Sequence, residues 1–145
     1  MPKRILIVLT AILFLLAAPR AIVADDAHTH GMGQKAMSDQ TLKQVMQGIQ
    51  GDLSRIVYGV SVDNMAVVAQ GARGIAHHPM PKGGMKPYIT KNADKLPAVV
   101  PKMDEMVHQS AVKIAAAADA GDRDAVVSHL STMIKGCVAC HQTFR

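Results

Sequence analysis

From residue 38 to the end of the chain, apolar residues recur at spacings of three and four, which is the period of a helix with one buried face. Four segments carry this pattern. We expect Ser38 to cap a first helix of about 20 residues, the second to span 63–76, the third to begin at Pro101, and the fourth to run from about Asp122 through His141. The inner stripe of the first helix comprises Leu42, Val45, Met46, Ile49, Leu53, Ile56, Val57 and Val60.

The segment 77–101 interrupts the periodic pattern between the second and third helices. It contains the pair Gly83-Gly84, and its prolines are Pro79, Pro81, Pro87, Pro97 and Pro101. We interpret it as one long connection, whereas the other two connections are short. Four amphipathic helices joined in this way, with no convincing strand, predict an all-α fold, an antiparallel four-helix bundle.

The first residues have a different pattern, which is typical of a secretory signal peptide. Lys3 and Arg4 supply a positive start, 5–18 is almost wholly apolar, and Ala24 is a small residue suited to a cleavage site. The apolar run is shorter than the roughly 20 residues that span a bilayer, which disfavours a permanent anchor. We therefore expect 1–24 to be removed on export to the periplasm, leaving no stable membrane span.

The residues after the signal peptide fall into two parts. The polar, glycine-rich segment 25–37 is interpreted as a flexible arm. Its His28, His30 and Met32 are weak candidate ligands for copper or nickel, but we favour a plain disordered tail over a metal site. The helical domain is predicted to span 38–145.

Loss of the signal peptide changes the charge of the protein. The full chain has 16 basic and 11 acidic residues, a net charge of +5. Lys3, Arg4 and Arg20 leave with the signal peptide, so the mature chain has 13 basic and 11 acidic residues, a net charge of +2. No basic patch with interleaved aromatic residues is apparent, so we do not expect nucleic acid as a partner.

The candidate chemistry lies in the last ten residues, G-C-V-A-C-H-Q-T-F-R, which hold the only two cysteines. On a helix, Cys137, Cys140 and His141 project from one face, continuing the stripe of Leu130, Met133 and Ile134. A C-x-x-C-H string is typical of covalent haem c attachment. Two thiols form thioether bonds to one haem, and the adjacent imidazole becomes an iron ligand.

Two other kinds of site also use a pair of cysteines at this spacing. A redox disulfide at C-x-x-C usually opens a helix after a strand, whereas Cys137 and Cys140 lie near the end of a helix with no strand before it. A zinc site needs a fourth ligand, and His129 is too far along the helix to supply it.

With these residues in view, the chain resembles the class II cytochromes c, which comprise cytochrome c′ and its low-spin relatives. The likeness covers roughly 38–145 and is specific in the last ten residues, including the aromatic residue and arginine after the motif. It implies that Arg145 pairs with a haem propionate. It also implies, from the string Q-V-M-Q-G-I-Q-G-D, that Met46 is the second axial ligand, as in low-spin members.

Several alternatives stay open for the second axial position of the iron. Met46 is also an ordinary core residue in a methionine-rich chain, and Met37 is the next candidate ligand. Gly48 would let a flat macrocycle approach the first helix. The pair His77-His78 is interpreted as two residues at the end of the second helix, where imidazoles interact well with the helix dipole. His108 and His129 are interpreted as boundary residues.

These observations favour a periplasmic electron carrier with one haem c, rather than an enzyme. Its partners would be redox proteins in the periplasm, and a homodimer is an open question. The alternative is a five-coordinate, cytochrome c′-like protein that binds nitric oxide or another small gas. A thiol redox or metal-binding helical protein is the third hypothesis.

Overall fold

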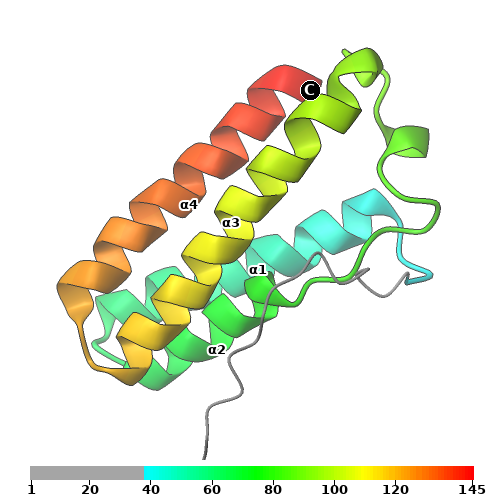
Figure 1. The fold of residues 1–145 in the computed structure, drawn as a ribbon. Helices are drawn as coiled ribbons and strands as arrows, with labels where there is room; N and C mark the ends of the chain where they lie inside the picture. Colours follow the sequence, from blue (N-terminus) through cyan, green and yellow to red (C-terminus); the bar gives the residue numbers. More distant parts are fainter. Residues whose placement is uncertain (1–37) are drawn as a thin grey trace, which may run out of the picture. The chain divides into compact units, whose positions relative to one another are not determined.

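The computed structural model describes residues 38–145, which form a bundle of helices (Figure 1). Among these residues there is no β-strand, and the main helices are α1 (Leu42–Ser61), α2 (Met65–Ala76), α3 (Leu96–Asp119) and α4 (Arg123–Phe144). The prediction of an all-α four-helix bundle is confirmed. The predicted signal peptide and arm, with His28, His30, Met32 and Met37, lie outside the described residues.

Helix α1 begins three residues later than predicted, because Thr41 and not Ser38 is its cap. The Thr41 hydroxyl oxygen accepts a hydrogen bond from the Gln44 amide, and the Gln44 side chain accepts one from the Thr41 amide at 2.8 Å. This reciprocal capping box satisfies two amides that the helix leaves unbonded. The Ser38 hydroxyl instead donates to the Met80 carbonyl at 3.0 Å and ties the chain to the long connection.

Helix α3 begins well before Pro101, so the prediction of its start was wrong. Pro97 lies in the first turn, where a missing amide costs nothing, and Pro101 lies inside the helix. Pro101 is exposed and forfeits a single backbone hydrogen bond near the helix start. Two prolines four residues apart both fit a helix start, and the sequence pattern selected the second.

The starts of the other two helices differ only slightly from the predictions. Asn64 caps α2, because Asp63 has a φ of 56° and cannot be helical. Asp122 caps α4 through its side chain, which accepts from the Ala125 amide at 3.0 Å. Helix α4 continues past His141 to Phe144, so the whole C-x-x-C-H string is helical.

Successive helices pack against one another: α1 against α2, α2 against α3, and α3 against α4 (Figure 1). Between them lies a core that we call the alanine-rich core, made of Ile56, Val68, Ala69, Ala72, Ile75, Ala111, Ile114, Ala115, Ala118, Val126 and Met133. Helices α1 and α2 approach closely, since a Cβ added at Gly59 would lie 2.7 Å from Val68 Cγ2. Small residues on these faces therefore allow close packing.

Two residues predicted on inner stripes are not inside. Val57 is 49% exposed and Ile134 is 39% exposed. Each lies next to a fully buried neighbour, Ile56 on α1 and Met133 on α4. Helices α1 and α4 make little direct contact with each other, so each buries a narrower stripe than a fully surrounded helix would.

The connection between α2 and α3 includes two 3₁₀ turns, Lys86–Tyr88 and Ala93–Lys95. It is fastened to the end of α4: the Lys91 ammonium donates to the Arg145 carbonyl, and the Asn92 side-chain amide donates to the Thr143 carbonyl, each at 2.6 Å. The last turn of α4 is therefore held in place. None of the described helices combines the length and the apolar character needed to cross a membrane.

Candidate haem site

A cavity of about 760 Å³ lies between α1 and α4, which make little direct contact with each other. Most of its lining is apolar and comes from three helices and the long connection. The lining includes Leu42, Val45, Met46, Ile49 and Leu53 of α1, Met80, Met85 and Tyr88 of the connection, Val100, Met103 and Val107 of α3, and Gly136, Cys137, Cys140, His141, Phe144 and Arg145 of α4. We call this region the cavity end of the bundle.

All five residues predicted to hold a haem line this one cavity. Cys137, Cys140 and His141 lie within about one helical turn on α4, whereas Met46 belongs to α1. Arg145 follows the last turn of α4. The structure therefore brings together, from two helices that scarcely touch, side chains separated by about 90 residues of sequence.

The cysteines are free thiols, and each is partly buried. Burial raises the pKa of the Cys137 thiol. Burial also raises the pKa of Cys140, with smaller contributions from Cys137 and the Asp104 carboxylate. Both groups are consequently protonated at neutral pH, which sets them apart from the low-pKa cysteines of redox-active C-x-x-C sites.

The electrostatics of His141 favour the neutral imidazole. Partial burial against the cavity wall lowers its pKa, and the positive charge of Arg145 lowers it further. A neutral imidazole keeps a lone pair for a metal ion, which an imidazolium lacks. The charge of Arg145 also makes this edge of the cavity suitable for a carboxylate.

Gly136 and Phe144, for which the sequence predicted no packing role, fix the position of the motif. A Cβ at Gly136 would lie 3.1 Å from both Met106 Cε and Val107 Cγ2, so α4 approaches α3 closely just before Cys137. Phe144 is buried just after His141. The attachment turn is thus bracketed by two packing contacts, and only the presence of a glycine and an aromatic residue beside the motif could have indicated them.

Two expectations about neighbouring residues need correction. Gly48 is exposed, does not line the cavity and has nothing within 4 Å of an added Cβ, so it offers no close approach to a macrocycle. His78 is more than a helix-end residue, because it lines the cavity together with Asp104. His77, its neighbour, is exposed at the cap of α2.

A comparison with protein families identifies the family of the chain. The family model described as cytochrome c′ matches residues 34–145. The chain belongs to the cytochrome c′ family. Comparisons with curated proteins and with solved structures found no match.

Membership of the cytochrome c′ family implies covalently bound c-type haem, and the residues present fit such a group. The volume of the cavity falls within the range of about 300–1,000 Å³ typical of cofactor sites. Its wall offers two thiols and an imidazole in one turn, which is the donor set that haem c attachment requires. Cytochrome c′-family proteins are typically exported and often dimeric.

Proposed function

We propose that this cytochrome c′-family protein is a periplasmic one-electron carrier rather than an enzyme, with one haem c and with His141 and Met46 as axial ligands. The observation that supports this proposal most is the lining of a single cavity by Met46 from α1 and His141 from α4. The haem supplies a one-electron change at iron. A thioether and an imidazole that both stay bound limit rearrangement during that change, and methionine raises the reduction potential.

The remaining residues of the chain hold and shield the cofactor in this proposal. Cys137 and Cys140 form the two thioether links, and Arg145 binds a propionate. The Lys91 hydrogen bond to the Arg145 carbonyl supports this role by ordering the C-terminal residue. The aliphatic and methionine side chains of the wall exclude water from the iron. The electron partners are other periplasmic redox proteins, encountered by a monomer or a homodimer.

A gas-binding, five-coordinate haem protein is the second candidate function. The methionine content of the cavity wall favours it, because Met80, Met85 and Met103 line the cavity together with Met46. Methionine fills irregular apolar space readily, so Met46 in such a wall can serve as packing alone. In that case the iron would keep one open position for nitric oxide.

Optical spectra of the ferric protein, matured in a host that exports and attaches haem c, test the ligation. We expect a low-spin spectrum with the weak band near the red end of the visible that marks a methionine–iron bond. Met46→Ala should lose that band and become high-spin, whereas the matched variant Met103→Ala should keep it. If Met46→Ala leaves the coordination unchanged, Met46 is not the ligand; a high-spin wild type that responds to nitric oxide would establish the second candidate.

A further inference from the structure

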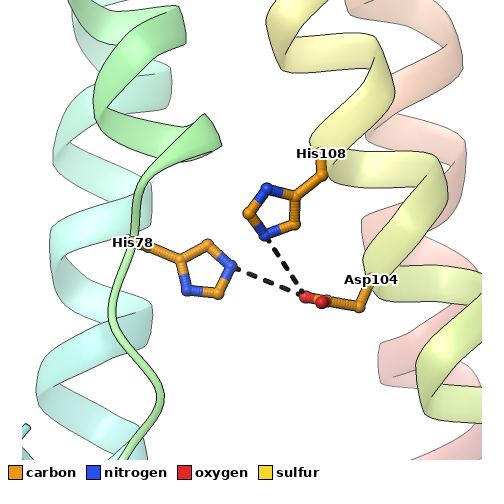
Figure 2. A group of neighbouring side chains, drawn as sticks. All are labelled: His78, Asp104 and His108. Carbon is orange, nitrogen blue, oxygen red and sulfur yellow. Dashed lines mark ion pairs between the residues drawn. The ribbon is translucent and has the colours of Figure 1, made fainter. Parts of the chain in front are cut away.

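A second group of potential ligands lies beside the haem cavity. His78 follows the end of α2, and Asp104 and His108 lie one turn apart on α3, with the three side chains directed toward one another (Figure 2). The Nε2 atoms of His78 and His108 are 3.6 Å and 3.7 Å from Oδ1 of Asp104. One ligand atom from each residue lies within 4.8 Å of the other two. We call these residues the His–Asp–His cluster.

The tautomer of His78 suits metal binding. Its Nδ1 lies 3.1 Å from the carbonyl oxygen of Pro79, and a carbonyl can only accept, so Nδ1 carries a proton and donates it. In the neutral ring Nε2 then presents its lone pair toward Asp104. Metal-binding histidines usually donate their second ring N–H to a carbonyl or a carboxylate in this way, which fixes the ring.

The donor atoms of the cluster suit a cation. Imidazole nitrogens and a carboxylate oxygen are common ligands of divalent metal ions. His78 directs its Nε2 at Oδ1 of Asp104. His108 directs its Nε2 at the same carboxylate oxygen, so a single cation at this point serves all three groups.

The two imidazoles of the cluster are more buried than its carboxylate. The side chains of His78 and His108 are only 12% and 17% exposed, whereas Asp104 is 37% exposed. The nitrogen ligands are therefore packed and ordered before any ion arrives, which reduces the entropy lost on binding. The more open carboxylate leaves a path by which an ion enters.

We propose that the His–Asp–His cluster binds a divalent transition-metal ion of the zinc class. Ligand bonds of about 2.0–2.2 Å in a tetrahedral site place ligand atoms roughly 3.3–3.6 Å apart. The two imidazole nitrogens lie at close to this separation, 3.6 Å and 3.7 Å, from Oδ1 of Asp104. Two imidazoles and a carboxylate are ligands of zinc sites that keep a further position open. Magnesium and calcium prefer oxygen ligands throughout, which this cluster does not offer.

The bound ion would fasten the start of the long connection to α3. His78 is the only one of the three ligands outside α3, and it lies two residues after α2 ends. Because His78 and Asp104 also line the haem cavity, the ion holds part of that wall in place. Metal binding at the His–Asp–His cluster does not depend on which residues ligate the haem iron.

Zinc titration of the mature, haem-loaded protein tests the proposal. His28→Ala and His30→Ala are introduced in every sample, so that histidines of the N-terminal arm cannot supply a site. After chelator treatment, we expect one zinc ion per chain by calorimetry and a higher melting temperature with zinc. His78→Ala and Asp104→Asn should each weaken binding about 100-fold, whereas His129→Ala, an α4 histidine outside the cluster, should not.

Zinc-edge X-ray absorption gives a readout that the haem iron does not obscure, and two histidine ligands are expected in it. Absence of stoichiometric binding, or binding that none of the cluster substitutions weakens, overturns the proposal and leaves the cluster as a structural contact between α3 and the connection. Loss of an iron ligand in His78→Ala in zinc-free buffer, seen in the iron spectrum, also overturns it, since His78 would then be a ligand of the haem. Haem content and circular dichroism establish that each variant is folded.

Discussion

The alanine-rich core and the cavity end of this bundle are built in opposite ways. In the core, alanine and β-branched residues let neighbouring helices approach until no further carbon fits, as at Gly59. At the cavity end, longer leucine and methionine side chains surround a space between α1 and α4. Packing between side chains determines the alanine-rich core, whereas the cavity end leaves space for a cofactor that is not part of the polypeptide.

This difference predicts that the two regions fail in different ways. Substitutions in the core should lower the stability of the bundle while leaving the haem chemistry intact. Substitutions at the cavity end should change haem attachment or spectra with smaller effects on the helices.

The largest effect is expected for the double variant Cys137→Ser/Cys140→Ser. Removal of both thiols leaves no group for a thioether bond, so no haem should remain on the chain after denaturation. Mass spectrometry of denatured protein measures the loss directly. Ser128→Ala on the same helix is the control and should keep the haem mass. Haem mass retained by the double variant would refute covalent attachment at this motif.

The next largest effect is expected for two matched substitutions on α1, one in the alanine-rich core and one at the cavity end. Ile56 is fully buried in the alanine-rich core, and Ile56→Ala should reduce the free energy of unfolding by about 2–5 kcal/mol. Leu42→Ala, at the rim of the cavity, removes a side chain that is only partly buried and should cost less. Denaturant unfolding of both haem-loaded variants measures the difference. Equal losses would mean that the rim is packed as firmly as the core.

The sequence also predicted some features of the two regions better than others. The spacing of Cys137, Cys140 and His141 predicted which side chains would meet, because a helix dictates its own faces. The periodic stripe also predicted the core, but it counted Val57 and Ile134 as inner residues. Apolar periodicity records which positions are hydrophobic and contains no information on whether a neighbouring helix covers them.

The cavity wall shows more clearly that a sequence pattern does not reveal which segments come together in space. His78 reaches the cavity from a connection that has no periodic pattern, so nothing local predicted its position. The choice between Pro97 and Pro101 as the start of α3 likewise depended on packing, since both prolines satisfy the local rule. Long-range placement of irregular segments was the part of the structure that the sequence pattern did not determine.

A smaller effect comes from two glycines that face different surroundings. Gly48→Ala meets nothing within 4 Å and should raise the free energy of unfolding by about 0.5–1 kcal/mol, because alanine favours the helix. Gly136→Ala meets Met106 and Val107 at 3.1 Å and should push α4 away from α3 beside the attachment turn. Denaturation curves and ferric spectra measure both variants. An altered spectrum for Gly48→Ala, with none for Gly136→Ala, would contradict the described cavity wall.

The smallest effect concerns the turn end of the bundle, farthest along the helices from the attachment motif. The Arg123 guanidinium donates to both carboxylate oxygens of Asp63, which fastens the start of α4 to the turn between α1 and α2. This hydrogen bonding holds the pKa of Asp63 below its ordinary value. Asp63→Asn keeps a residue that tolerates the φ of 56° but removes the charge, so it should lower the melting temperature slightly at neutral pH.

The pH dependence of this difference in melting temperature between wild type and Asp63→Asn identifies its cause. A carboxyl group whose pKa is lower in the folded than in the unfolded protein stabilises the fold above the unfolded pKa of about 3.9. That contribution is lost as the pH falls through the lower folded-state pKa, so wild type and Asp63→Asn should converge in acid. Added salt should also narrow the gap, because both side chains are exposed. A difference that persists unchanged in acid and in salt would trace instead to the backbone of the turn, and the ion pair would then contribute nothing to joining α4 to the turn between α1 and α2.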